Sequence, residues 1–330
     1  CSLLVSVLAV VHGAQLVDPS SAKWDGCSHV SGEYSTRRQN GFVPGLYVVT
    51  SNIPGAMRNR DGSLADRKIV CAHQDYRTSG GSVVIPWAQF DKRDGNGGGF
   101  FDWDFVDSQM KPWVSRGQVV NLLVWPAVQK KEQLFPNSGS ATPDYIMGDL
   151  NMTYQCPDGS AQGGNSEGIP LPMFWKPDVY EKYAQALQQF VRHYEDHPNV
   201  NVFRFGIGVG AESYPGNGAT TPTNYCMDTF VNQFEGATYE ERAMNAYNTW
   251  SEYAAGRVRA FRRFSSKKPI VVTINDFYTL SSISTVKFPN MVATEATKDY
   301  VVNGVQFPRL GLGVQGATTG DVEKYDKGGI

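Results

Sequence analysis

Short apolar runs rich in β-branched residues alternate along the chain with longer segments of helical periodicity, and this alternation restricts the possible folds more than any other feature. Strands separated by helices pair in parallel, because each helix returns the chain to the edge of the sheet where the previous strand began. Helices are predicted at 101–117, 176–197 and 239–264. The runs that predict strands are residues 45–51, 82–87, 118–125, 201–209, 270–274 and 310–314.

This order predicts an α/β fold of the (β/α)8 TIM-barrel type, and the 330 residues are enough for one barrel domain, expected over residues 16–330. Six βα-like units are two fewer than a barrel contains, so we expect the barrel to be incomplete at its C-terminal end. Residues 291–302 fit either a helix or a short strand. Residues 130–172 and 213–238 are rich in Gly, Pro and Asn and lack periodicity, which predicts long functional loops.

Residues 1–15 form a short apolar segment that ends in small residues, which is typical of a secretory signal peptide and too short to span a bilayer. No Met or basic residue precedes this segment, so we expect the chain to begin within the signal; the alternative is a buried N-terminal strand. The prediction is a secreted protein without membrane contact after signal removal. The formal net charge of −2 gives no basis for binding nucleic acid or an anionic membrane.

Four cysteines follow that segment, and an even number in a secreted protein predicts two disulfides with three possible pairings. We favour Cys156 with Cys226, because both lie in the two long loops, and Cys27 with Cys71. Asn151 begins the sequence Asn-Met-Thr, a predicted glycosylation site in a loop. The cysteine and histidine spacings do not indicate a metal site, and we expect no cofactor.

Polar and aromatic residues follow the predicted strands, at the edge where a parallel barrel carries its active site. Carboxylates and amides exchange hydrogen bonds with hydroxyl groups, and indole rings stack on sugar faces, so this set suits a neutral oligo- or polysaccharide. Each of these polar and aromatic residues could instead cap the end of a strand or form a hydrogen bond to a loop. The candidate substrate-binding residues are Trp87, Trp125, Gln129, Tyr214, Asn275, Asp276 and Gln315.

Glu212 stands just past the fourth predicted strand, in a stretch with three glycines between Arg204 and Pro215. Glycoside hydrolysis needs a carboxyl group that protonates the leaving oxygen. Burial or a neighbouring carboxylate keeps such a group partly protonated at neutral pH. We therefore predict that Glu212 is the acid/base carboxylate. The alternatives are a salt bridge to Arg204 or a helix cap.

Two stretches resemble clan A glycoside hydrolases. Trp87–Asp91 (Trp-Ala-Gln-Phe-Asp) and then Phe101–Asp107 (Phe-Asp-Trp-Asp-Phe-Val-Asp) are similar to the segment after the second strand in β-galactosidase-like and cellulase-like members. Residues 206–215 resemble the fourth-strand segment that carries their acid/base Glu. The resemblance implies a retaining glycosidase with Glu212 as acid/base. Ala211 stands where the clan usually has an Asn that contacts the sugar 2-hydroxyl.

The mechanism stays open because it depends on a second catalytic carboxylate, in addition to Glu212, that the sequence does not identify. The clan places its nucleophile after the seventh strand, which we expect beyond Ile330, and Glu295 is a weak candidate because it fits a helix face. A non-catalytic carbohydrate-binding or pseudoenzyme barrel is the alternative function. An inverting hydrolase or a lyase that uses Glu212 with Asp276 is a third. A carboxyl separation of about 5–5.5 Å predicts retention, and about 6.5–9.5 Å predicts inversion.

Overall fold

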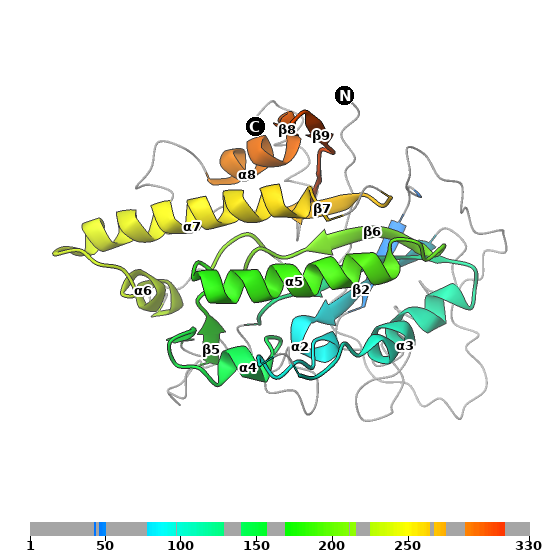
Figure 1. Cartoon of the computed structure of the whole chain (residues 1–330), viewed down its shortest axis with the longest axis horizontal. Coiled ribbons are helices and arrows are strands. Elements are labelled where there is room, and N and C mark those ends of the chain that lie inside the picture. The colour runs from blue at the N-terminus through cyan, green and yellow to red at the C-terminus, as the bar shows by residue number, and fades with distance from the viewer. Residues whose placement is uncertain are drawn as a thin grey trace, which may run out of the picture.

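A six-stranded parallel sheet forms the centre of the molecule, as a computed structural model shows (Figure 1). The structure describes residues 43, 46–50, 78–96, 98–128, 140–156, 169–210, 212–215, 225–264, 267–274 and 288–313. The strands stand side by side in the order in which the chain makes them: β1 (Leu46–Thr50), β2 (Thr78–Pro86), β3 (Val119–Trp125), β6 (Val200–Phe205), β7 (Ile270–Thr273) and β10 (Gly311–Gly313).

Every neighbouring pair in this sheet is parallel. The strand order never reverses along the sheet, whereas a doubly wound sheet has a point at which the order switches. Sequential parallel strands with helical connections are the arrangement of a (β/α)8 barrel. The predicted α/β fold of the barrel type is therefore confirmed.

Helices cover one face of the sheet. In Figure 1, α5 (Pro177–Tyr194, green) and α7 (Tyr239–Phe261, yellow) lie along it, and α8 (Phe288–Thr297) lies beside α7. Two further helices, α2 (Trp87–Phe90) and α3 (Trp103–Val114), lie between β2 and β3 along the chain. A capping box of Thr238 and Glu241 starts α7, and its two reciprocal hydrogen bonds satisfy backbone donors that would otherwise lack partners. Residues 291–302, which fitted a helix or a strand, belong to α8 and to the short strand β8 (Tyr300–Val302).

Alternate residues of the strands face opposite sides of the sheet. On β3, Val120, Leu122 and Val124 belong to the large core cluster that includes the buried faces of α5 and α7. Leu123 and Trp125 belong to a second cluster on the opposite face, together with Val84 of β2, Val128 and Ala141. This second face is the one that a barrel encloses, so we refer to it as the inner face.

The two long segments that were expected to be loops contain short elements of secondary structure. Residues 130–172 include α4 (Asp144–Met147) and the antiparallel pair β4 (Thr153–Cys156) and β5 (Ile169–Pro172), and residues 213–238 include α6 (Tyr225–Val231). Each strand has four residues, too few to show periodicity, and burial of Tyr154 and Leu171 holds the pair in place. β5 and α6 lie at the end of the molecule to which β6 points (Figure 1).

The predicted signal segment, residues 1–15, lies outside the described residues, as do Cys27 and Cys71. A last hairpin consists of β8 and β9 (Val305–Phe307). Among the described helices, none combines the length and the apolar character that a bilayer crossing requires.

Candidate active site

Glu212 lies in a tight loop at the carboxyl end of β6, which we call the Glu212 loop (residues 206–210 and 212–215). Val209 forms a parallel bridge with Ala127, and the amide of Gly210 donates to the Ala127 carbonyl at 2.8 Å, so the loop lies beside the end of β3. The amides of Ile207 and Gly208 both donate to the carbonyl of Glu212, at 3.1 and 2.7 Å. The backbone of Glu212 is therefore tied back to the end of its own strand.

Two glycines permit this fold-back. Gly210 has a φ of +64°, in the left-handed region that other residues rarely adopt. A Cβ at Gly208 would lie 1.9 Å from the carbonyl oxygen of Tyr214, inside any allowed contact. Two of the three glycines in this stretch are thus required by the backbone path that presents Glu212.

Burial dominates the electrostatics of Glu212. The side chain is half-buried, and desolvation raises the pKa of its carboxyl group above the ordinary value. A hydrogen bond from Tyr214 and the positive charge of Arg204 both act in the opposite direction, because each favours the carboxylate. A carboxylic acid that is harder to ionise than usual can donate a proton at a pH where an exposed Glu cannot.

Arg204 is a buried cation whose charge acts on Glu212. It is buried on β6, where its Nε and Nη2 atoms donate to the hydroxyl of Thr273 on β7 at 3.0 and 2.8 Å. Burial lowers the pKa of Arg204 to about 10, and the charge of Glu212 opposes that shift. The guanidinium remains charged at neutral pH, so it stabilises Glu212 whenever Glu212 is ionised.

Four buried aromatic side chains donate hydrogen bonds to carbonyls of the Glu212 loop, and we call them the aromatic cradle. Tyr183 donates to Gly206 at 3.0 Å and Tyr253 to Ile207 at 2.8 Å. Trp250 donates to Ser213 at 2.9 Å, and Tyr154 to Pro215 at 3.1 Å. They come from α5, α7 and β4. Sequence reasoning missed this role, because the pattern shows only that these rings face the core.

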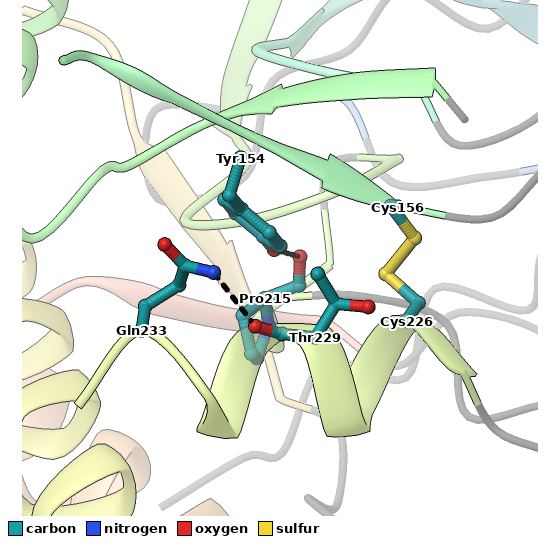
Figure 2. Close-up of a disulfide and its surroundings, with 6 residues drawn as sticks. All are labelled: Tyr154, Cys156, Pro215, Cys226, Thr229 and Gln233. Carbon is teal, nitrogen blue, oxygen red and sulfur yellow. Dashed lines mark hydrogen bonds between the residues drawn. A yellow bond between two sulfur atoms is a disulfide. The ribbon is translucent and has the colours of Figure 1, made fainter. Parts of the chain in front are cut away.

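The predicted disulfide between Cys156 and Cys226 is present, with Cα atoms 4.6 Å apart. Figure 2 shows that it joins the end of β4 to α6, while Tyr154, two residues earlier on β4, reaches Pro215. The two long segments therefore meet at the Glu212 loop. Asn151 is exposed on the turn before β4, and its glycosylation stays a prediction.

Trp87 does not have the predicted role of a sugar platform. Its side chain is 0% exposed and packs against Tyr183 and Tyr145, with ring centroids 4.9 and 6.4 Å away. Its Nε1 donates to Asp91 at 2.8 Å. The chain turns into α2 directly after β2, and this turn directs the indole into the core beneath the helices.

Trp125 lies at the carboxyl end of β3 on the inner face and is 8% exposed. The indole N–H finds no hydrogen-bond partner in the described part of the chain. A role in substrate binding stays a prediction for Trp125. Tyr214 contacts Glu212 directly through its hydroxyl group. Four other predicted substrate-binding residues lie outside the described residues: Gln129, Asn275, Asp276 and Gln315.

Glu295 lies on α8, where it pairs with Arg259 of α7 at 3.2 Å and with Lys298. These contacts agree with a helix-face role and do not support Glu295 as a nucleophile. His193 stacks on Trp103 with ring centroids 4.4 Å apart. Within the described ranges, His, Cys, Asp and Glu side chains do not gather in any group of three that would hold a metal ion.

Neither a protein-family model nor a curated protein matches the sequence. Solved structures do match. A β-galactosidase from the psychrophilic Marinomonas ef1 has 12% identity and a TM-score of 0.33 over 60% of this chain and 33% of its own. The catalytic domain of β-amylase from Paenibacillus polymyxa has 12% identity and a TM-score of 0.36, over 58% of each chain. Endo-glycoceramidase II from Rhodococcus sp. has 15% identity and a TM-score of 0.38, over 74% of this chain and 53% of its own.

The chain thus spans less than two thirds of the length of each of these three structures. All three TM-scores are below 0.5.

Proposed function

We propose that this chain is the catalytic part of a secreted, retaining glycoside hydrolase that acts on β-linked oligo- or polysaccharides. The observation that carries the proposal is the placement of Glu212. A half-buried carboxyl group with a raised pKa lies at the carboxyl end of a parallel, barrel-type sheet. The N-terminal apolar segment supports secretion, and the motif resemblance supports retention and β-linked sugars.

Glu212 acts first as an acid and then as a base. In its protonated form it donates a proton to the oxygen of the leaving sugar, as glycoside hydrolysis requires. The resulting carboxylate is stabilised by the Tyr214 hydroxyl and the Arg204 charge, so donation does not leave an unsupported anion. The same carboxylate then takes a proton from the attacking water. Retention requires a second carboxyl group about 5–5.5 Å from Glu212, which bonds to the anomeric carbon as the bond to the leaving sugar breaks and is displaced from it by the water.

The test is Glu212→Gln in the full-length protein, since the amide keeps the shape of the side chain but cannot donate the proton. General acid/base groups contribute on the order of 10²–10⁴-fold in rate. We expect a loss of that size in kcat/KM on β-linked oligosaccharides. The loss should be smaller on 4-nitrophenyl β-glycosides, whose leaving group departs with little protonation.

Glu295→Gln is the matched control, because it makes the same change at an ion pair between α7 and α8 and should leave both rates unchanged. Equal losses on both substrate types together with a lower melting temperature would show that Glu212 is structural. Binding of oligosaccharides without any hydrolysis by the unaltered protein would favour the non-catalytic carbohydrate-binding alternative.

A further inference from the structure

The backbone of the Glu212 loop is not paired within a helix or a strand, so several of its carbonyls need hydrogen bonds from side chains. Its described residues belong to neither a helix nor a strand, yet each of them is buried or half-buried. Buried carbonyls without donors cost free energy, so each one requires a partner. The aromatic cradle supplies these partners from side chains that belong to three separate elements.

Helix α7 holds the loop on both sides of Glu212. Tyr253 donates to Ile207, whose own amide donates to the Glu212 carbonyl at 3.1 Å. Trp250 donates to Ser213, the residue that follows Glu212. Residues three apart lie on the same face of a helix. One face of α7 therefore fixes the segment that enters Glu212 and the segment that leaves it.

The two donors are themselves rigidly held. Trp250 is fully enclosed, and its ring contacts Tyr253 with centroids 4.9 Å apart. Tyr253 stacks on Phe174 with centroids 6.1 Å apart and an interplanar angle of 20°. A donor with so little freedom fixes the position of its acceptor. The position of α7 thereby sets the position of the Glu212 backbone.

We propose that Tyr253 and Trp250 are positioning residues. They act on the reaction by holding the Glu212 carboxyl group where it can donate its proton to the substrate oxygen. This inference rests on the proposed function, because it assigns the residues that orient the acid/base of that site. Displacement of a catalytic group by about 1 Å costs on the order of 10²-fold in rate. A hydroxyl that restrains the backbone beside Glu212 therefore affects turnover as well as stability.

Tyr253→Phe is the decisive variant, because it removes one hydroxyl and keeps the packed ring. Tyr194→Phe is its matched control. Tyr194 is also a buried tyrosine, and its hydroxyl donates to Asp107 at 2.9 Å and lies 3.3 Å from the Trp103 carbonyl, away from the Glu212 loop. Both variants lose a hydrogen-bonded hydroxyl from the core, so a purely structural role predicts the same outcome for both.

Turnover of 4-nitrophenyl β-galactoside, 4-nitrophenyl β-glucoside and a β-linked tetrasaccharide is measured with the full-length protein. We expect Tyr253→Phe to lower kcat on the tetrasaccharide on the order of 10-fold with KM changed less than about twofold. Tyr194→Phe should keep kcat while lowering the melting temperature by a similar amount. Equal kcat values in the two variants would overturn the proposal.

The carboxyl of Glu212 gives a second measurement that does not need turnover. Its titration is followed by NMR with 13C-labelled Glu, and Glu212→Gln identifies the signal. The groups that act on its pKa are Arg204 of β6 and Tyr214 of its own loop, and burial is the largest effect. A loosened loop admits water, so Tyr253→Phe should lower the Glu212 pKa toward the ordinary value.

The two measurements separate the two proposals. If Glu212→Gln keeps full activity, the acid/base function fails, and the Glu212 titration alone decides whether Tyr253 positions this carboxyl group. If Glu212→Gln is inactive while Tyr253→Phe leaves kcat and the Glu212 titration unchanged, only the positioning role fails.

Discussion

Asp91→Ala should strongly destabilise the fold, because Asp91 is the acceptor at the centre of a buried network. Its carboxylate is fully buried and accepts from Trp87 Nε1, the Tyr145 hydroxyl and Arg93 Nε, each at 2.8 Å, and from Arg93 Nη2 at 2.7 Å. Removal of one partner of a buried ion pair costs about 3–5 kcal/mol, since it leaves the other charge uncompensated. Arg93 is 22% exposed and regains some water, so we expect a loss near the lower end, about 3 kcal/mol.

Urea denaturation followed by tryptophan fluorescence measures this loss, and thermal melting should show a fall of roughly 4 °C for a chain of 330 residues. Asp94→Ala is the control in the same loop. The Asp94 carboxylate is exposed and accepts from the backbone amides of Asn96 and Gly98, so its loss should cost about 0.5 kcal/mol. If Asp91→Ala instead melts like the unaltered protein and loses sugar binding, then Trp87 and Asp91 line the substrate site. Our assignment of these two residues to the core would then be wrong.

Three further predictions concern the site and its surroundings. Tyr214→Phe removes a hydrogen bond that lowers the Glu212 pKa, so the alkaline limb of the kcat/KM profile should move to higher pH; an unchanged limb would exclude this contact. The raised pKa of Glu212 means that its stabilising contribution is present at low pH and lost as pH rises through that pKa. Glu212→Gln should therefore melt higher than the unaltered protein at pH 8, with a smaller difference at pH 4, and a lower melting temperature at pH 8 would contradict this. Replacing both Cys156 and Cys226 by Ser opens a link between residues 70 positions apart and should cost about 2–4 kcal/mol in urea denaturation, whereas an unchanged midpoint would show that the link does not stabilise the fold.

The sequence predicted the sheet and the main helices because these elements carry strong local patterns. α5 buries Val179, Tyr183, Leu187, Phe190 and Tyr194, whose spacing repeats with the helical period. Strand β3 is apolar on both faces, as expected of a parallel strand covered on both sides. In these elements the tertiary packing favours the same secondary structure as the local sequence, so the hydrophobic pattern alone was sufficient to predict them.

Contacts between distant residues could not be predicted in this way. Trp87 was assigned to the substrate because it follows a strand, but its direction depends on Asp91 and on Tyr145, which lies 54 residues beyond Asp91. Similarly, helical periodicity predicts that Tyr183 and Tyr253 face the core, without indicating which carbonyl their hydroxyls meet. Pairing of β4 with β5 depends on partners across a long connection and leaves no periodic signal in four residues.

The Glu212 loop combines features that each reduce stability. Gly208 and Gly210 lose more conformational freedom on folding than other residues, and Glu212 and Arg204 are ionisable groups removed from water. A chain selected for stability alone would replace the two ionisable groups with apolar residues that pack in the same space. Their presence at the carboxyl end of a parallel sheet, under hydrogen bonds from a rigid helix, is what a functional site requires. The same balance explains why one substitution, Glu212→Gln, is expected to raise the melting temperature at pH 8 while it removes the proton donor.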